Sequence, residues 1–257
     1  MTGRLHTLLA VPVLALLGLV VSGPAMSAHP EACLAVGHQS ETALPLPQVT
    51  RAINAGQLSI LVLGAGSSSL PGPDGGKNAY PVRLRLALAA MLPGVEVKVA
   101  TDVKSRRTAA DMVKSLPASL AAAKPALLIW QTATVDAMQS VDPEQFSRTL
   151  DKGVNIARSA GADVIFVNPQ YSPRTESMIA LNTYIENLRW VAVQQEVPVF
   201  DRFAVMKTWA DLGVFDLYSA TKKLDMAERV HDCIGRLLAG LVVEVAKPGG
   251  PRSEGGR

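Results

Sequence analysis

The sequence predicts an α/β domain built on a five-stranded parallel sheet. Short apolar or β-branched runs, flanked by glycine, proline or polar residues, alternate with longer segments of helical character. Such runs are typical of strands in parallel sheets, and their alternation with helices is the pattern of βαβ units. Of the 257 residues, 48% are apolar and 18% are charged, which predicts a large hydrophobic core and excludes a disordered chain.

The expected elements follow one another along the chain without an internal repeat. We expect strands at 58–63, 95–100, 126–131, 162–167 and 197–200. We expect helices at 46–55, 80–91, 108–123, 142–161, 177–195, 202–212 and 226–245.

Capping residues support two of these helices. Thr108 and Asp111 have the spacing of a capping box with aspartate in place of glutamate. Asp142 caps the helix that Gly161 ends. Pro117 lies inside the helix at 108–123, and we expect it to kink or split that helix because proline lacks an N–H donor and its ring clashes with the preceding turn.

Residues 1–28 have the composition of an export signal. Arg4 precedes an unbroken apolar run at 8–21, and small residues at 25–28 offer a cleavage site. The run is shorter than the roughly 20 residues that span a bilayer as a helix, so a cleaved signal is favoured over an uncleaved anchor. This predicts a periplasmic or secreted protein with no stable membrane span after cleavage.

The rest of the chain divides into an N-terminal arm at 29–57, a domain at 58–246 and a disordered tail at 247–257, which is rich in glycine, proline and charge. In an oxidising compartment two cysteines tend to pair. We therefore predict a disulfide between Cys33, near the mature N-terminus, and Cys233, in the last helix. Two free buried thiols are the alternative.

Composition excludes several classes of function. A net charge of +3, scattered along the chain, does not support nucleic-acid binding. Four histidines and two cysteines leave little material for a metal site, and neither a metal nor a cofactor is expected. The loop at 64–69 lacks the third glycine of a dinucleotide fingerprint, and Pro71 and Asn78 occupy the glycine and hydroxyl positions of a P-loop.

Ser67 and Ser68 lie in this loop, directly after the first strand. Loops that follow parallel strands meet at one edge of the sheet, where the functional sites of such folds lie. A turn of small residues there can expose a nucleophilic serine, provided that a base and oxyanion donors are within reach. Ordinary turn formation by serine is the alternative.

Several segments together resemble a known family. They are 60–64 followed by 66–69, 79–84, 125–131 followed by 136–137, 168–173, 197–200 and 232–237. On these segments the chain, from about 47 to 245, resembles the SGNH (GDSL-like) hydrolases, in particular exported bacterial members. The resemblance implies a flavodoxin-like, three-layer α/β/α sandwich and the chemistry of esterases, lipases and carbohydrate deacetylases.

The catalytic blocks of that family fall on atypical residues here. The family's nucleophile position falls on Gly66, with Ser67 and Ser68 beside it, and the family's third block, Gly-x-Asn-Asp, has valine in place of its oxyanion-donating asparagine. The family's Asp-x-x-His pattern falls on 222–225, with lysine for the aspartate and aspartate for the histidine. The cleft positions that match these blocks are Gly66, Ser105, Ala133, Val135, Asp136, Lys222 and Asp225.

No histidine replaces the missing base in the sequence pattern. A solvated carboxylate at Asp225 is a poor base for a serine hydroxyl, and a salt bridge between Asp225 and Lys222 is the simpler expectation. His231 lies in the last helix, where we expect a packed or partly exposed helix residue. Asp136 is expected to cap a helix or brace a loop.

Three functional hypotheses follow. The first is a catalytically degenerate SGNH-fold protein that binds a glycan, an acyl ester or a protein partner. The second is an active ester or acyl hydrolase that uses Ser67 or Ser68 with a non-standard base. The third, a metal-dependent or nucleotide enzyme, is disfavoured by the composition and by the shortage of histidine.

A basic cluster adds one question about the ligand. Lys104, Arg106 and Arg107 lie in one loop at the expected ligand-facing edge, and Lys222 and Lys223 lie in another. If the two loops converge, the rim of the cleft is positive and favours an anionic polysaccharide or lipid head group. A solvated loop is the alternative.

Overall fold

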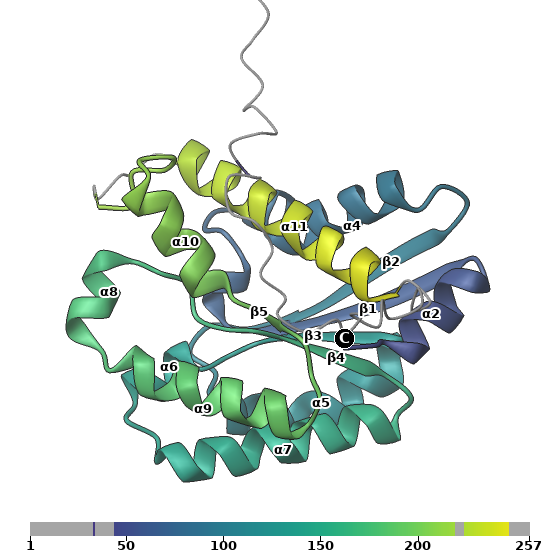
Figure 1. Ribbon diagram of the computed structural model, residues 1–257, viewed down its shortest axis with the longest axis horizontal. Coiled ribbons are helices and arrows are strands. Elements are labelled where there is room, and N and C mark those ends of the chain that lie inside the picture. Colours follow the sequence, from purple (N-terminus) through teal and green to yellow (C-terminus); the bar gives the residue numbers. More distant parts are fainter. Residues whose placement is uncertain (1–32, 34–43, 219–223, 247–257) are drawn as a thin grey trace, which may run out of the picture.

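The computed structural model describes residue 33 and residues 44–218 and 224–246. A five-stranded, entirely parallel sheet in the order β2-β1-β3-β4-β5 forms its centre (Figure 1). The strands are β1 (Gln57–Gly64), β2 (Glu96–Val103), β3 (Leu127–Gln131), β4 (Asp163–Val167) and β5 (Val199–Phe200). All five expected strands are present, with boundaries shifted by at most three residues.

Helices cover both faces of this sheet. On one face lie α4 (Tyr80–Met91) and α11 (Leu224–Ala246), and on the other lie α5 (Ala109–Ala123), α7 (Pro143–Ser159) and α9 (Leu181–Gln194) (Figure 1). The remaining helical segments are α2 (Pro47–Asn54), η1 (Gly66–Ser68), α3 (Gly75–Asn78), α6 (Thr134–Met138), α8 (Pro173–Met178) and α10 (Arg202–Asp211). The architecture is the three-layer α/β/α sandwich that the resemblance implied.

The core lies in the middle of the sheet. Every residue of β3 is buried, and Trp130 of β3 packs against Phe166 of β4 with ring centroids 5.6 Å apart. β2 differs from the buried strands that its composition suggested, because it is an edge strand and its exposed residues alternate with half-buried ones over much of its length. An edge position leaves part of a strand in contact with solvent, whatever its apolar content.

Two helix predictions are changed by the structure. α5 runs without a break across Pro117, so the proline does not split the helix and the expected kink stays a prediction, while the predicted capping box between Thr108 and Asp111 is present. The segment predicted as one helix at 177–195 is instead α8 followed by α9, with Ile179 and Ala180 between them in non-helical conformation. The short segments η1, α3, α6 and α8 are too brief for their periodicity to be recognised in a sequence.

Two long-range interactions hold the N-terminal part against the domain. Cys33 and Cys233 form a disulfide with Cα atoms 5.2 Å apart, as predicted. The carboxylate of Asp163, at the start of β4, accepts hydrogen bonds from the backbone N–H groups of Gln48 (2.7 Å) and Val49 (3.0 Å). α2 has no side-chain cap of its own, and Asp163 supplies this contact from a distant strand.

Some of the expectations concern residues outside the described ranges. The export signal at 1–28, most of the arm before residue 44 and the tail at 247–257 belong to this group. None of the described helices is both long enough and apolar enough to cross a bilayer.

Close packing between α7 and β3 predicts a sensitive position. A Cβ atom on Gly153 would lie 2.3 Å from Cζ3 of the buried Trp130. Gly153→Ala should lower the free energy of unfolding by about 1–3 kcal/mol through overpacking, although alanine is the better helix former by about 1 kcal/mol. Urea denaturation measures the change. Gly76→Ala is the matched control, because a Cβ there meets no atom within 4 Å; equal behaviour of the two variants would contradict the packing.

The disulfide predicts a dependence of stability on reductant. It closes a loop with a sequence separation of 200 residues, so its reduction should lower the free energy of unfolding by about 2–5 kcal/mol. Denaturation with and without dithiothreitol measures this change. The Cys33→Ser, Cys233→Ser double variant should show no response to dithiothreitol. If the denaturation midpoint of the wild type were the same with and without dithiothreitol, the prediction would be refuted.

Candidate functional site

The serine loop lies at the switch point of the sheet. In the order β2-β1-β3-β4-β5, the chain passes from β1 to β2 on one side, and β3, β4 and β5 then follow one another on the other side of β1. The connections that leave β1 and β3 therefore run in opposite directions. Ligands of such folds bind in the crevice at the carboxyl ends of these two strands. β1 ends at Gly64, just before η1, and β3 ends at Gln131.

Gln131 connects the two strand ends. Its side chain is fully buried, and its Oε1 accepts hydrogen bonds from Ser68 Oγ (2.9 Å), Ser67 Oγ (3.2 Å) and the backbone N–H of Ala65 (3.3 Å). One amide oxygen therefore holds the whole turn after β1. The hydroxyl hydrogens of both candidate nucleophiles are directed to an amide.

Ser68 is the more enclosed of the two serines. It is buried, and Tyr80 Oη lies 3.1 Å from its Oγ. Because Ser68 donates its hydrogen to Gln131, the tyrosine hydroxyl is the donor in this second contact. A Cβ on Gly64 would lie 2.3 Å from Ser68 Oγ, so the absence of a side chain at Gly64 makes room for the buried hydroxyl. Ser67 is half-buried.

Tyr80 and His231 form the support beneath the loop. The backbone N–H of Tyr80 donates to Nδ1 of His231 at 3.0 Å, and both side chains are buried. Burial raises the pKa of Tyr80, which keeps its hydroxyl neutral at pH 7. Burial and, to a smaller extent, the charge of Arg202 lower the pKa of His231 to about 3. His231 is thus a packed, neutral residue, as its position in the helix suggested.

Arg202 reaches the serine loop from the start of α10. It is fully buried, with Nη1 donating to the carbonyl of Ser67 (3.0 Å) and Nη2 to Oε1 of Gln170 (3.2 Å). Its guanidinium lies 5.7 Å from the centre of the Tyr80 ring. Asn168, after β4, fixes the first turn of α10 by accepting from the backbone N–H of Phe203 at 2.9 Å.

The loops after β1 and β2 also meet. A Cβ on Gly66 would lie 3.3 Å from Ser105 Oγ, so these two expected cleft positions are neighbours. Both residues are exposed. The structure therefore brings the serine loop together with the loop after β2.

The third block keeps a glycine-like backbone. Ala133 has φ 83° and ψ −33°, a conformation that favours glycine, which is the residue that the SGNH family has at this position. Val135 is half-buried and has no side-chain donor. Asp136 is buried, and its carboxylate accepts from the backbone N–H of Ala109 at 2.9 Å, at the start of α5. Burial raises the pKa of Asp136 despite these backbone hydrogen bonds.

The position matching the base lies in an exposed turn. Asp225 is exposed in the first turn of α11. Lys222 and Lys223 lie outside the described residues, so the expected pairing of Lys222 with Asp225 stays a prediction. In the described part of the chain, neither an imidazole nor a carboxylate hydrogen-bonds to Ser67 or Ser68.

The positive charge of the basic loop after β2 is largely neutralised by Asp102, which lies near the end of β2. Arg107 is buried and donates to Asp102 at 2.7 Å, and Lys104 lies 3.9 Å from the same carboxylate. Burial alone would raise the pKa of Asp102, but hydrogen bonds from Ser119, Arg107 and Ser115 outweigh it and hold the pKa below its usual value. Of the three cations only Arg106 has no charge partner among the described residues.

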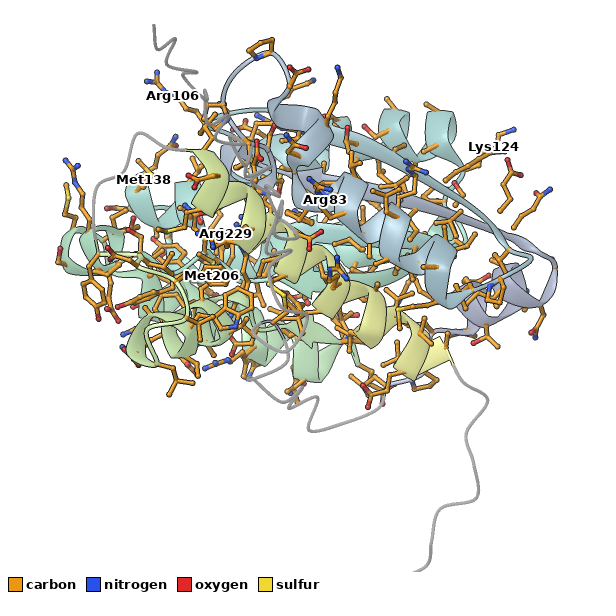
Figure 2. The ribbon with its side chains drawn as sticks, turned by 90° about the horizontal axis from the view of Figure 1, so that it is seen from above. Arg83, Arg106, Lys124, Met138, Met206 and Arg229 are labelled. Atoms are coloured by element: carbon orange, nitrogen blue, oxygen red, sulfur yellow. A yellow bond between two sulfur atoms is a disulfide. The ribbon has the colours of Figure 1, made fainter. Side chains whose placement is uncertain are left out.

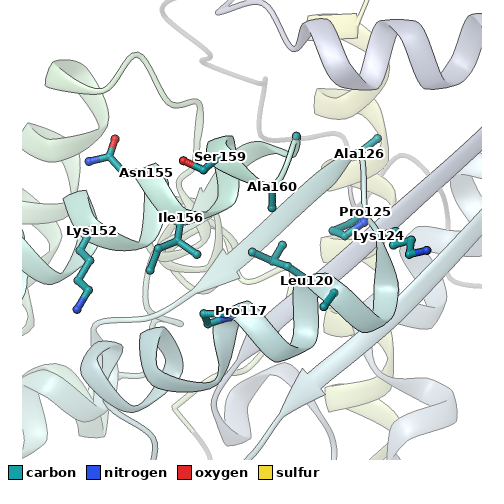
Figure 3. Close-up of a pocket in the computed structure, with 12 residues that line it drawn as sticks. Pro117, Leu120, Lys124, Pro125, Ala126, Lys152, Asn155, Ile156, Ser159 and Ala160 are labelled. Atoms are coloured by element: carbon teal, nitrogen blue, oxygen red, sulfur yellow. The ribbon is translucent and has the colours of Figure 1, made fainter.

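A separate hollow lies at the other end of the strands, beside the residues that precede β3. It has a volume of about 1200 Å³ between the carboxyl-terminal parts of α5 and α7. Figure 3 shows Pro117, Leu120 and Ile156 facing one another there. Lys124 is in its lining and lies just before β3, at the other end of the molecule from Arg106 and Met138 (Figure 2). This hollow is therefore not part of the serine site.

The comparisons with known proteins identify the family. The model of the Non-GDSL lipase-like family matches residues 32–248. The chain belongs to this family. No match is found among the curated proteins.

Solved structures of esterases share the fold of this Non-GDSL lipase-like protein. A lipase/acylhydrolase from Enterococcus faecalis is 20% identical, with 74% of this chain and 96% of that chain covered and a TM-score of 0.55. A catalytic mutant of Axe2, an acetylxylan esterase from Geobacillus stearothermophilus, is 15% identical, with 73% and 95% covered and a TM-score of 0.58. A two-domain esterase active on acetylated mannans is 14% identical, with 81% and 54% covered and a TM-score of 0.62.

Sequence reasoning on this Non-GDSL lipase-like chain missed the residues that hold the serine loop. Gln131 and Arg202 were not singled out, although each carries a usable signal. Gln131 is the one polar residue of an otherwise apolar buried strand, and Arg202 lies two residues after the end of β5. Buried polar residues at the carboxyl ends of parallel strands are candidates for site residues for this reason.

The buried His231 predicts an acid-sensitive fold. Its folded pKa of about 3 lies below the unfolded value near 6.5, so the stability it provides is present above pH 6.5 and is lost as the pH falls toward 3. In His231→Asn, an amide oxygen replaces Nδ1 as the acceptor and does not titrate. Between pH 6 and pH 4 the wild type should lose about 1.4 kcal/mol per pH unit relative to this variant in urea denaturation. If the free energy of unfolding changed with pH in the same way in both proteins, His231 would not be the source of the acid sensitivity.

Proposed function

We propose that this protein is a catalytically degenerate member of its SGNH-like family that binds an acylated glycan or acyl ester outside the cytoplasm. The observation that carries the proposal is the hydrogen bonding of Ser67 and Ser68. Both hydroxyls donate to Oε1 of Gln131. An amide oxygen accepts a hydrogen bond but has no basicity with which to remove the proton, whereas a nucleophilic serine needs a base in that place.

The described residues around the two serines offer no replacement for the base. Nδ1 of His231 is occupied by the backbone N–H of Tyr80, and the pKa of this histidine is lowered to about 3. Asp225 is exposed to solvent, where a carboxylate is a weak base for a serine hydroxyl. Both features support loss of hydrolysis.

The oxyanion side of the cleft supports the same proposal. Val135 stands where the SGNH family has an asparagine donor. Removal of a single oxyanion donor typically costs about 10²–10³ in rate. Combined with the missing base, this substitution leaves a cleft suited to binding more than to acyl transfer.

The class of ligand is proposed from the structural relatives. Two of them are described as an acetylxylan esterase and as an esterase active on acetylated mannans. An acylated polysaccharide is therefore the first ligand to test, and a protein partner is the second possibility.

The proposed location is the periplasm or the exterior of the cell. The export-type composition of 1–28 supports it, and so does the disulfide between Cys33 and Cys233, because such bonds persist in oxidising compartments.

An active hydrolase is the second candidate function. Ser67 favours it, because this serine is half-buried, follows β1 directly and lies beside the exposed Gly66 and Ser105. A ligand that displaced the hydroxyl from Gln131 would leave Ser67 free to react. Such an enzyme would need a base from a group other than Gln131 or His231.

Hydrolysis assays separate the two functions. We expect wild type and the Ser67→Ala, Ser68→Ala double variant to release p-nitrophenol from p-nitrophenyl acetate and from longer acyl esters at the same rate, since neither hydroxyl has a base. Ser69→Ala is the matched control, because Ser69 Oγ bonds only to the carbonyl of Leu70 among the described contacts. Turnover that the double variant loses and the control keeps would establish the hydrolase instead.

A binding assay tests the positive half of the proposal. Acetylated xylan and mannan oligosaccharides should bind in isothermal titration calorimetry, and their chemically deacetylated forms should bind more weakly. Absence of binding by all acylated glycans and acyl esters tested would refute the ligand class.

A further inference from the structure

Among the described residues, the buried guanidinium of Arg202 has no counter-ion. The side chain is fully buried, and burial lowers its pKa only to about 10, so it is charged at pH 7. Its hydrogen-bond acceptors, the carbonyl of Ser67 and the amide of Gln170, are both neutral. No carboxylate among the described residues pairs with it. A buried, unpaired charge costs several kcal/mol, so this arrangement needs compensation.

The neighbouring groups supply only part of that compensation. The centre of the Tyr80 ring lies 5.7 Å from the guanidinium, and a cation–π contact of this kind stabilises a buried charge only in part. Burial raises the pKa of Tyr80, so this hydroxyl carries no negative charge at pH 7. Arg107, the other buried arginine, shows the usual solution, because Asp102 lies 2.7 Å from its Nη1.

Two buried donors in this region have no acceptor. They are Nε of Arg202 and Nε2 of Gln131. Both side chains also contact the same residue, since Arg202 donates to the carbonyl of Ser67 and Gln131 accepts from its hydroxyl. Unsatisfied donors on two fully buried side chains, one of them charged, point to a missing anionic acceptor. Ser67, which both side chains contact, is half-buried, and its neighbour Gly66 is exposed.

We propose that the Arg202–Gln131 cluster beside Ser67 binds the carboxylate group of an acidic ligand. This inference rests on the proposed binding function and adds a carboxylate group to the features that the cleft would recognise in its ligand. A single negative charge matches a single guanidinium, whereas a phosphate dianion would call for a second cation, and the described residues place no other cation in hydrogen-bond contact with this cluster. The planar guanidinium and the side-chain amide both donate to carboxylate oxygens. The carboxylate belongs either to an acidic sugar or to an aliphatic acid.

Calorimetry with small carboxylates on the full-length protein tests the proposal. The probes are sodium glucuronate and sodium hexanoate at constant ionic strength and pH 7, with glucose and hexanamide as their uncharged counterparts. At least one carboxylate should bind, and its uncharged counterpart should not. Glucuronate binding alone indicates an acidic glycan, and hexanoate binding alone indicates an aliphatic acid. Absence of carboxylate binding, or equal binding of the uncharged probe, overturns the proposal.

Two variants locate the site. Arg202→Met removes the charge and should weaken carboxylate binding at least about 10-fold, as expected for loss of a hydrogen bond to a charged group. Arg107→Met, which removes the paired arginine, should leave carboxylate binding unchanged. Equal affinity in wild type and Arg202→Met refutes the assignment.

A second variant guards against a folding defect in Arg202→Met. Gln131→Glu keeps an acceptor oxygen for Ala65, Ser67 and Ser68 and replaces the free donor with a negative charge. It should remain folded and lose carboxylate affinity at least about 10-fold, because the protein then supplies its own anion. Unchanged affinity in Gln131→Glu also overturns the proposal.

The outcome is separable from that of the proposed function. Ester turnover is compared between the wild type and the Ser67→Ala, Ser68→Ala double variant, whereas carboxylate binding is measured on the wild type, so each result is obtained independently of the other. Serine-dependent ester turnover together with carboxylate binding refutes only the loss of catalysis. Absence of both turnover and carboxylate binding refutes only this inference.

Discussion

A single amide oxygen holds the functional edge of the molecule together. Oε1 of Gln131 receives hydrogen bonds from the backbone of Ala65 and from the hydroxyls of Ser67 and Ser68, so the end of β3 dictates the path of the chain after β1. The positions of Tyr80, Arg202 and His231 follow from that path, because each contacts the turn or a residue that contacts it. The same oxygen occupies the hydroxyls that a serine hydrolase would direct to a base.

The polarity of the site is unusual for a hydrolase fold. Its buried charge is an arginine, its buried histidine is held neutral, and the nearest buried carboxylate that the sequence pointed to, Asp136, is used to hold the start of α5. Among the described residues, these groups favour negative charge on a ligand, and none of them is placed to accept a proton from Ser67 or Ser68. They support the proposed recognition of an anionic or acyl-bearing ligand.

The fold was largely predictable because its signals are local. The apolar runs of β1, β3 and β4, the capping box of α5 and the cap at Asp142 each depend on neighbours within a few residues. Errors arose where context decides. Pro117 is accommodated within α5, and β2 lies at an edge. The candidate serines were found by their place after β1, but Gln131 and Arg202 were not, because their partners lie 63 to 135 residues away in the sequence.

The sequence by itself determined the fold class, the family resemblance and the pairing of Cys33 with Cys233, since residue type and spacing are enough for these conclusions. The replacement of the asparagine and histidine of the family blocks stays a prediction from the resemblance. Only the tertiary structure decided how the serine hydroxyls are bonded, that His231 is neutral and that Arg202 is buried without a counter-ion. The physical reason is that hydrogen bonding and desolvation depend on distances between β1, β3, α4, α10 and α11, which are remote in sequence and meet only when the sheet and its helices pack.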